Sequence, residues 1–365
     1  MDKRAKILFT ISNFKTAGSG KVVYDLVKGL DKTVFDVEIA CGSDEGPFFQ
    51  TVASLGVPIH IFHTKTSYRP YATIFWRILK ISRFYKQQHY DLIHSWQWSS
   101  DWTEALAAKL AGIPWIYTKK AMGFGNRHWQ FKSYLADFII TINDEMSGYF
   151  PNKKNQRLIP LGLDVEYYNP SNIPYRPKDN TTFNLIMVAN LVPVKGLEVL
   201  LRALVLLDNK NIRLQVVGKC DNTYGITMQQ LVSELGLVSQ VVFHGIQLDV
   251  RPYLAHADLF VIPTLDEGRK EGMPMALVEA MSMAVPVIGS DITGINFVLR
   301  DFKHLLFKAN DPQVLADKLA TFVAMRLTDR QALGEALRAY CIANYSYKTF
   351  VTAHEHLYEE LLCNN

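Results

Sequence analysis

The sequence predicts an α/β protein with two Rossmann-like, doubly wound domains facing a cleft, and three observations carry this prediction. The 365 residues exceed what one hydrophobic core usually organises. Short apolar runs alternate with helical stretches along the chain, which is typical of parallel sheets covered by helices. A proline-rich polar segment at 169–180 interrupts the alternation before it restarts. We therefore expect domains at 1–170 and 171–346, with a last helix within 347–365.

The first domain begins with an apolar run that we interpret as a strand. Basic residues precede this run, but Ser12, Asn13 and Lys15 end it too early for the apolar core of a signal peptide. Helical stretches such as Lys21–Leu30 and Thr103–Ala111 separate it from later apolar runs. The expected strands are Lys6–Ile11, Phe35–Ala40, Pro58–His63, Asp91–His94, Trp115–Thr118 and Phe138–Ile142.

The second domain repeats the same alternation. A helix is expected from Met275 to Met283, and Asp311-Pro312 supplies an N-cap and a first-turn proline for a later helix. The last helix is expected at about Tyr347–Leu362. The expected strands are Asn184–Ala189, Arg213–Val217, Val241–His244, Leu259–Pro263 and Val287–Ser290.

Composition narrows the class of protein. The hydrophobic share of 48% and the charged share of 20% are those of a globular chain. No apolar run approaches the ~20 residues that cross a bilayer, so we expect a cytoplasmic location. The cysteines lack C-x-x-C spacing and the close histidine pairs lack further ligands, so we expect reduced thiols and no metal site. The cysteines are Cys41, Cys220, Cys341 and Cys363.

The most informative segment places two carboxylates, Glu271 and Glu279, eight positions apart. Glu271 falls in a loop between a buried strand and a helix, and Glu279 falls about one turn into that helix. Such a loop presents free N–H groups and the positive end of a helix dipole, which suit a phosphate. The two carboxylates could then bind hydroxyls. The plainer alternative is that Glu271 is an ordinary first-turn acid favoured by the helix dipole and that Glu279 is a solvated surface residue.

The following residues, 280–290, add a helix end, a proline turn and another buried strand. Together these segments resemble the donor-binding segment of the family 4 retaining glycosyltransferases, which have the GT-B fold and an E-x7-E motif. The resemblance implies acceptor binding by the first domain and nucleotide-sugar binding by the second. It also implies that the last helix crosses back to pack on the first domain.

The resemblance assigns roles to individual residues. Glu279 would bond the ribose of the donor, and Glu271 would hold hydroxyls of the donor sugar. Lys195, in a loop before an apolar helix, would neutralise the departing diphosphate, although a lone loop lysine can also be merely solvated. Gly218 would let the backbone approach the nucleotide, or would serve only as a turn glycine. The backbone expected at the donor comprises Gly272, Met273, Pro274 and Met275.

Four positions depart from the family pattern. Asn190 stands where an Arg is usual, and it supplies neither charge nor a bidentate fork. Thr293 and Phe297 stand at a usual Gly and a usual Glu. Lys120 falls where many members place a His near the donor sugar; it could stabilise phosphate charge but is a poor proton shuttle unless its pKa is lowered.

The segment after the first strand contains Gly18 and Gly20 and enters a helix. A Walker A loop would need Gly at Lys15 and Ser or Thr at Val22, so that interpretation fails. In the resembled family this loop closes over the donor phosphates.

Charge is unevenly distributed: residues 1–170 contain 21 Lys and Arg against 15 Asp and Glu. The stretch 65–86 is basic and aromatic without an acid, so it could lie on an anionic membrane surface. The alternative is an ordinary helix with core aromatics and solvated bases. We expect no nucleic-acid partner, because no binding motif accompanies the charge.

These features predict a retaining glycosyltransferase that uses a nucleotide sugar, such as a UDP-sugar, and a glycan or lipid-linked acceptor in surface polysaccharide, lipopolysaccharide or glycolipid synthesis. No cofactor is expected beyond the donor substrate. The chain contains no Asp-x-Asp, which favours a metal-independent reaction with electrostatic stabilisation of the leaving group. The alternative is a nucleotide-sugar-binding partner subunit with little or no turnover.

Overall fold

The computed structural model describes residues 4–15, 17–120, 122–174, 181–268 and 271–363. The chain divides into two compact units: unit 1 comprises 1–162 and 347–365, and unit 2 comprises 163–346. The division falls shortly before the expected boundary at 170. The reason is that the Tyr168 carbonyl accepts hydrogen bonds from Ser282 and Arg338, both in unit 2. The expected linker residues 175–180 lie outside the described residues.

The described part of unit 1 contains a seven-stranded sheet in the order β3-β2-β1-β4-β5-β6-β7. Every neighbouring pair is parallel. The order reverses direction between β1 and β4, which makes this edge the topological switch point. The strands are β1 (Ala5–Ile11), β2 (Phe35–Cys41), β3 (Ile59–Ile61), β4 (Leu92–Ser95), β5 (Trp115–Lys119), β6 (Phe138–Thr141) and β7 (Gln156–Leu158).

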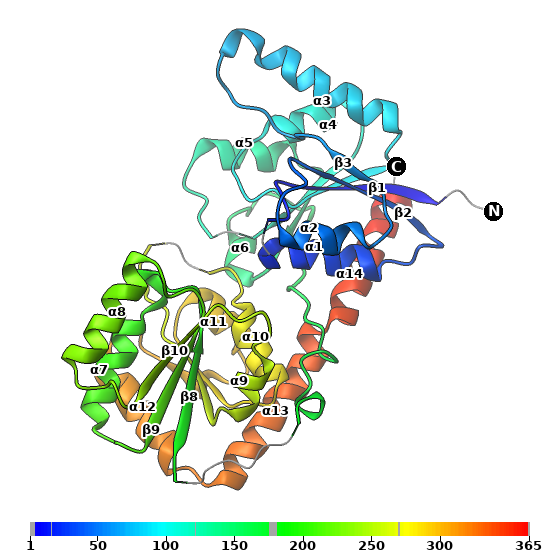
Figure 1. Ribbon diagram of the computed structural model, residues 1–365. Coiled ribbons are helices and arrows are strands. Elements are labelled where there is room, and N and C mark those ends of the chain that lie inside the picture. Colours follow the sequence, from blue (N-terminus) through cyan, green and yellow to red (C-terminus); the bar gives the residue numbers. More distant parts are fainter. Residues whose placement is uncertain (1–3, 16, 121, 175–180, 269–270, 364–365) are drawn as a thin grey trace. The chain divides into compact units, whose positions relative to one another are not determined.

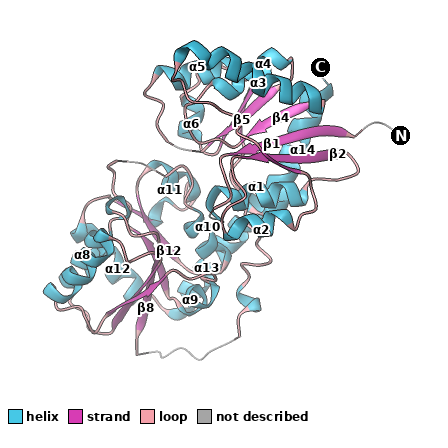
Figure 2. Ribbon diagram, turned by 45° about the horizontal axis from the view of Figure 1, so that its top comes forward, coloured by secondary structure: helices cyan, strands magenta, loops and turns pink. Residues whose placement is uncertain are grey.

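Helices cover both faces of this sheet (Figure 2). The C-terminal helix α14 (Tyr347–Cys363) belongs to unit 1 and packs on α1 (Ala17–Gly29) (Figure 1). A Cβ at Gly29 would clash with Tyr347 and Val351, so glycine permits this close packing. The other helices are α2 (Pro47–Ala53), α3 (Ile74–Gln88), α4 (Thr103–Ala111), α5 (Arg127–Leu135) and α6 (Asp144–Gly148), with a 3-10 turn at Tyr71–Thr73.

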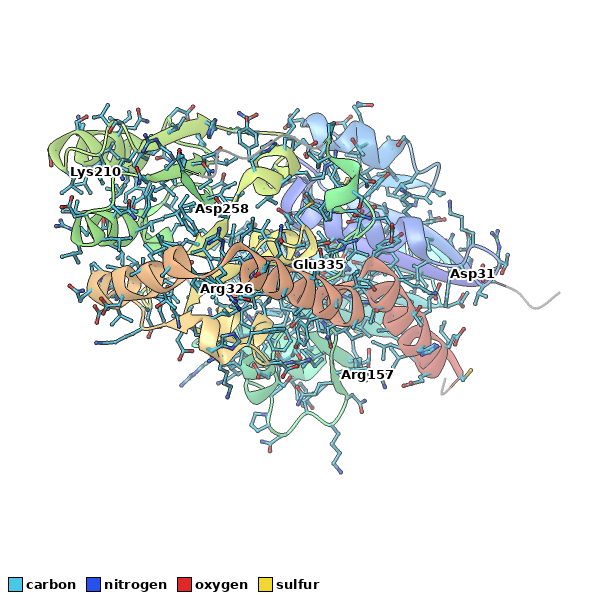
Figure 3. The ribbon with its side chains drawn as sticks, turned by 90° about the horizontal axis from the view of Figure 1, so that it is seen from below. Asp31, Arg157, Lys210, Asp258, Arg326 and Glu335 are labelled. Atoms are coloured by element: carbon cyan, nitrogen blue, oxygen red, sulfur yellow. The ribbon has the colours of Figure 1, made fainter. Side chains whose placement is uncertain are left out.

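Polar contacts also hold α14 within unit 1. Arg157, labelled in Figure 3, forms an ion pair of 2.7 Å with Glu360. The backbone N–H of Asp31, also labelled there, donates to Glu355 over 2.8 Å. Inside the unit, His94 Nδ1 and the Tyr358 hydroxyl share a buried hydrogen bond of 2.6 Å. The last helix is therefore part of the core of unit 1.

The described part of unit 2 contains a six-stranded parallel sheet in the order β10-β9-β8-β11-β12-β13. Its strands are β8 (Phe183–Val188), β9 (Ile212–Val217), β10 (Val241–Gly245), β11 (Leu259–Ile262), β12 (Val287–Ser290) and β13 (Leu306–Phe307). Its helices are α7 (Leu197–Leu207), α8 (Thr223–Glu234), α9 (Arg251–His256), α10 (Met275–Ser282), α11 (Thr293–Val298), α12 (Pro312–Ala324) and α13 (Leu327–Tyr345). Short 3-10 turns lie at Pro170–Asn172, Pro193–Lys195 and Lys303–Leu305.

Two parallel α/β units confirm the predicted fold class, and the predicted strands agree with the observed ones to within about two residues. The sequence analysis missed β7 and β13, which have three and two residues and are too short for a clear apolar pattern. Asp311 caps α12 as expected, because its side chain accepts from the Val314 N–H. Helix α1 begins at Ala17, earlier than the expected Lys21.

Candidate functional site

In unit 2, the loops after β8 and β11 meet at the carboxyl edge of the sheet. Gly196 has a φ of 68°, a conformation that favours glycine, and a Cβ there would clash with the carbonyl of Pro263. The N–H of Leu265 donates to the carbonyl of Val194 over 2.8 Å. This close approach carries Lys195 to the end of β11, where the loop containing Glu271 begins.

Lys195 and Glu271 form an ion pair between Nζ and Oε1. Burial lowers the pKa of Lys195 to about 8. The adjacent carboxylate opposes this lowering, since it favours the charged ammonium. The other Glu271 oxygen, Oε2, is buried and has no hydrogen-bond partner among the described residues. Such a group retains the capacity to accept a hydrogen bond from a ligand.

A pocket of about 50 Å³ opens beside this pair. Its floor comes from the ends of β8 and β11, and its other wall comes from the start of α10. Thr264 lines it with a fully buried side chain whose Oγ1 has no hydrogen-bond partner in the described residues. The lining residues include Ala189, Lys195, Thr264, Glu271, Pro274 and Ala276.

The start of α10 favours an anion in this pocket. Pro274 precedes the helix, and no side chain caps its first N–H groups. Met275 and Ala276, the first helical residues, line the pocket. Free N–H groups and the positive end of the helix dipole therefore lie beside the Lys195 ammonium, and together they suit a phosphate group.

Glu279 lies one turn further along α10 and interacts with Tyr168. Burial, and then the Glu279 carboxylate, raises the pKa of the Tyr168 phenol above its ordinary value, so the hydroxyl stays protonated and donates to Glu279. The backbone of Tyr168 is fixed in turn, because its carbonyl accepts from Ser282 Oγ at 2.7 Å and from Arg338 at 3.1 Å. Tyr168 therefore positions the Glu279 carboxylate.

Comparisons with known proteins agree with this architecture. Residues 16–167 match the family model described as Glycosyltransferase Family 4, and residues 182–325 match the one described as Glycosyl transferases group 1. The chain belongs to the family 4 glycosyltransferases of the GT-B fold.

Individual relatives are more distant. The chain is 28% identical to a D-inositol 3-phosphate glycosyltransferase of Corynebacterium jeikeium, over 74% of this chain and 73% of that protein. It is 24% identical to the UDP-Gal:alpha-D-GlcNAc-diphosphoundecaprenol alpha-1,3-galactosyltransferase of Escherichia coli, over 82% and 81% of the two chains. The Anabaena protein HepE, solved with UDP and glucose, superposes with a TM-score of 0.79 at 19% identity, over 98% of this chain and 100% of that one.

The other predicted donor residues of this glycosyltransferase lie at the same edge of unit 2. Asn190 is exposed directly after β8. Gly218 has a φ of 138° and abuts the Ala189 carbonyl, so a turn requires glycine there. Gly272 and Met273 are buried between Glu271 and α10. A Cβ at Gly294 would clash with the Glu271 carbonyl, so this glycine lets α11 approach the loop.

The departures from the family pattern have structural consequences. Phe297 stands where an acid is usual, and it is a buried core residue with the Arg300 guanidinium 5.2 Å from its ring centre. Thr293 begins α11 and is partly exposed. Neither Thr293 nor Phe297 therefore adds an acid to Glu271 and Glu279.

Three predicted site residues belong to unit 1. Gly18 and Gly20 lie inside α1, whereas the sequence analysis expected a loop. A Cβ at Gly20 would approach Phe14 and Phe48 closely, so packing within unit 1 already requires this glycine. Lys120 follows β5 and donates to the carbonyl of Trp96 over 2.6 Å. Burial, and then the charge of Lys132, lowers the pKa of Lys120 to about 7.

Sequence reasoning missed Thr264 and Tyr168. Thr264 directly follows the predicted strand Leu259–Pro263, and polar residues at carboxyl ends of parallel strands are candidate ligands by position alone. Tyr168 gave no comparable signal. Among the described residues, no group of three or more His, Cys, Asp or Glu side chains is arranged to hold a metal ion. No helix within the described ranges has the length and apolar character to span a bilayer.

Proposed function

We propose that this glycosyltransferase is a retaining, metal-independent enzyme that moves a sugar from a nucleoside diphosphate donor to a glycan or lipid-linked acceptor. The observation that carries the proposal is the pocket of unit 2, where Lys195, Glu271 and the uncapped start of α10 lie together. The name of the Escherichia coli relative, with its UDP-galactose donor and diphosphoundecaprenol-linked sugar, and the Anabaena structure with UDP and glucose support a UDP-sugar donor and a lipid-linked acceptor.

Each group in the pocket has a definite task in this proposal. Transfer breaks the bond between the sugar C1 and a diphosphate oxygen and forms a bond between C1 and an acceptor hydroxyl oxygen, whose proton passes to the departing phosphate. Negative charge develops on that phosphate oxygen as the first bond breaks. The Lys195 ammonium and the α10 N–H groups stabilise that charge without reorganisation, which is usually the largest catalytic contribution. Glu271 and Thr264 hold hydroxyls of the donor sugar, and Glu279 holds the ribose.

Lys120 of unit 1 remains a proposed catalytic residue. Its lowered pKa of about 7 allows both the charged and the neutral form near neutrality. A charged Lys120 would stabilise departing phosphate charge, and a neutral one would accept a proton.

Ligand-dependent unfolding tests the donor assignment. UDP at about 100 times its Kd should stabilise the purified chain by about 2.7 kcal/mol in the presence of EDTA, because a ligand that binds only the native state stabilises it. Stabilisation that requires Mg²⁺ would contradict the metal-independent mechanism. Release of UDP from a UDP-sugar, with or without acceptor, then measures turnover.

A partner subunit that only binds the nucleotide sugar is the second candidate. The buried Phe297 in place of an acid and the exposed Asn190 in place of an Arg favour it. Binding of UDP-sugars without any release of UDP, across donors and acceptors, would favour this candidate over the enzyme.

We also propose that unit 1 associates peripherally with the cytoplasmic face of an anionic membrane through α3. The start of α3 and the preceding turn expose large aromatic side chains, with Tyr71 68%, Phe75 54% and Trp76 65% exposed. Lys80 and Arg83 are exposed on the same stripe as Trp76, at helical spacings of four and seven. Exposed aromatic and basic residues on one helix suit a lipid interface.

The structure refines how α3 should be tested. Arg77 already donates to Thr66, Ser67 and the Pro70 carbonyl, so it holds the preceding loop. Changing Lys80 and Arg83 to Gln should weaken binding to phosphatidylserine vesicles by about 1 kcal/mol per charge, with UDP binding unchanged. Equal vesicle binding by the variant and the parent would assign α3 to packing alone.

A further inference from the structure

Unit 1 has a polar cluster at the switch point between β1 and β4. Lys65 Nζ donates to Ser12 Oγ over 3.2 Å, and Ser12 Oγ donates to Gln97 Oε1 over 2.6 Å. Gln97 Nε2 donates in turn to Thr64 Oγ1 over 3.3 Å. These residues follow β1, β3 and β4, so the cluster joins the carboxyl ends of three strands. Ligands of open α/β sheets bind at such a point.

Lysines gather behind this cluster. Lys132, fully buried on α5, donates to the Ser99 carbonyl over 2.9 Å and lies 4.9 Å from the centre of the Tyr117 ring. Lys120 donates to the Trp96 carbonyl, and Lys119 donates to the Gly123 carbonyl over 2.9 Å. Lys132 interacts electrostatically with each of the others. We call Lys65, Lys119, Lys120 and Lys132 the lysine cluster.

Two carboxylates face the lysine cluster. Glu104 is buried and accepts from Ser95 Oγ at 2.5 Å, and Asp101 accepts from the Thr103 N–H and hydroxyl. Neither comes within ion-pair distance of Lys120 or Lys132 in the described structure. Lys65, Lys120 and Lys132 alone outnumber these two carboxylates, so the cluster carries an excess of formal positive charge.

A buried excess of charge is costly unless a counter-charge accompanies it. The lysines show this cost, because burial lowers the pKa of Lys119 and of Lys120 to about 7 and that of Lys132 to about 8. Glu104 and Asp101 oppose the lowering at Lys132, and Lys65 adds to it. An arriving dianion would remove the cost and recharge the neutral lysines.

We propose that the lysine cluster, with Ser12 and Gln97, binds a phosphate group carried by the acceptor. This inference rests on the proposed function and names its acceptor class. A phosphate supplies the negative charge that this excess lacks, and its oxygens accept from the Lys65 ammonium, the Ser12 hydroxyl and the Gln97 amide. Lys65 and Ser12 are only partly buried, so they form the entrance. Lys132 is fully buried, so it would stabilise the phosphate by its charge and without a direct hydrogen bond.

Titration calorimetry on the full chain tests the site with glucose 6-phosphate, glucose and farnesyl diphosphate as probes. The parent should bind at least one phosphate probe, and glucose should bind at least tenfold more weakly. Lys65→Met should reduce phosphate binding at least tenfold, the effect of one charge-assisted hydrogen bond. Lys28→Met, an exposed lysine on α1, is the matched control and should bind like the parent.

Two variants separate this site from the donor pocket. Lys195→Met should lose UDP binding and keep the phosphate probe, whereas Lys65→Met should do the reverse. If UDP does not bind in the pocket of unit 2, the proposed function fails, but Lys65→Met should still lose the phosphate probe. Binding of farnesyl diphosphate without glucose 6-phosphate would identify a lipid headgroup as the source, and the opposite result would identify a soluble sugar phosphate.

Proton uptake on phosphate binding tests whether the buried lysines respond to the ligand. A lysine that only supports the structure would not change this uptake when it is replaced. At pH 8, phosphate binding should take up about one proton, measured from binding heats in buffers with different ionisation enthalpies. Lys132→Met should reduce this uptake, and Lys65→Met remains decisive should Lys132→Met fail to fold. Equal binding by Lys65→Met and the parent, equal binding of glucose, absence of phosphate binding, or absence of proton uptake would each overturn the proposal.

Discussion

Each unit has a lysine of lowered pKa at its candidate site, but the two lysines have different partners. In unit 2, Lys195 contacts the carboxylate of Glu271. In unit 1, Lys132 donates to the backbone carbonyl of Ser99 and lies among aromatic rings. Burial lowers both pKa values to about 8, although Lys132 is fully buried and the Lys195 side chain is 17% exposed. The two sites therefore differ in counter-charge as well as in burial.

This difference determines what a ligand must do. An anion that enters the pocket of unit 2 competes with Glu271 for the Lys195 ammonium, and the displaced carboxylate becomes available to hydroxyls. An anion that enters unit 1 meets charge that no carboxylate neutralises at ion-pair distance within the described structure. In unit 2, a bound anion would therefore replace the Lys195–Glu271 ion pair with an ion pair between Lys195 and the anion. In unit 1, a bound anion would itself supply the negative charge beside Lys120 and Lys132.

Removal of Lys195 should produce the largest effect. Lys195→Met should lower UDP-sugar turnover by about 10²–10³-fold, because one preorganised group that stabilises leaving-group charge is lost. It should also destabilise the protein by on the order of 1–3 kcal/mol, since the partly buried Glu271 carboxylate loses its partner. Enzyme kinetics and urea unfolding measure the two effects.

A double variant sharpens this result. Lys195→Met combined with Glu271→Gln should recover most of the stability, because no unpaired charge remains, but none of the turnover. Lys219→Met, a half-exposed lysine of unit 2, is the control and should change neither. Turnover by Lys195→Met close to that of the parent would remove Lys195 from the mechanism.

Lys132 should have a pH-dependent effect on stability. Its native pKa of about 8 lies below the ordinary 10.5, so the unfolded chain binds more protons between these values and the parent becomes more stable as pH rises. Lys132→Met lacks this contribution. Its stability relative to the parent should therefore fall by on the order of 3 kcal/mol from pH 7 to pH 10.5.

Urea unfolding of Lys132→Met, the parent and Lys28→Met across this pH range measures that difference. Lys28→Met should follow the parent at every pH because its side chain is exposed. A constant difference between Lys132→Met and the parent would show that Lys132 is fully charged in the native protein.

The two carboxylates of unit 2 should give smaller and distinct effects. Glu279→Gln should weaken both UDP and UDP-sugar by at least about tenfold, because the ribose is common to both ligands. Glu271→Gln should spare UDP and reduce sugar transfer by a similar factor. Tyr168→Phe should follow Glu279→Gln with a smaller loss of about 1 kcal/mol, because it removes one hydrogen bond to Glu279.

Isothermal titration with UDP and UDP-sugar, beside a transfer assay, separates these roles. If both Glu variants bind and turn over like the parent, the spacing of Glu271 and Glu279 has no functional meaning. If Tyr168→Phe changes stability without weakening UDP, Tyr168 contributes to packing alone.

The sequence by itself determined the fold class and most strands, because apolar periodicity reports directly which residues a parallel sheet buries. It also placed Glu271 and Glu279 at one strand-to-helix loop, because both depend on local order along the chain. Lys195 lies in another loop, between β8 and α7, and only the family resemblance assigned it to the same site. The short strands β7 and β13 gave no such pattern.

Tertiary structure alone decided the partners of the buried polar groups. The Thr264 hydroxyl has no hydrogen-bond partner among the described residues because β8, β11 and α10 enclose it. Tyr168 reaches Glu279 across 111 positions, and Lys65 reaches Ser12 across 53. Hydrogen bonds and desolvation depend on which elements pack together, and no periodicity in the sequence encodes that choice.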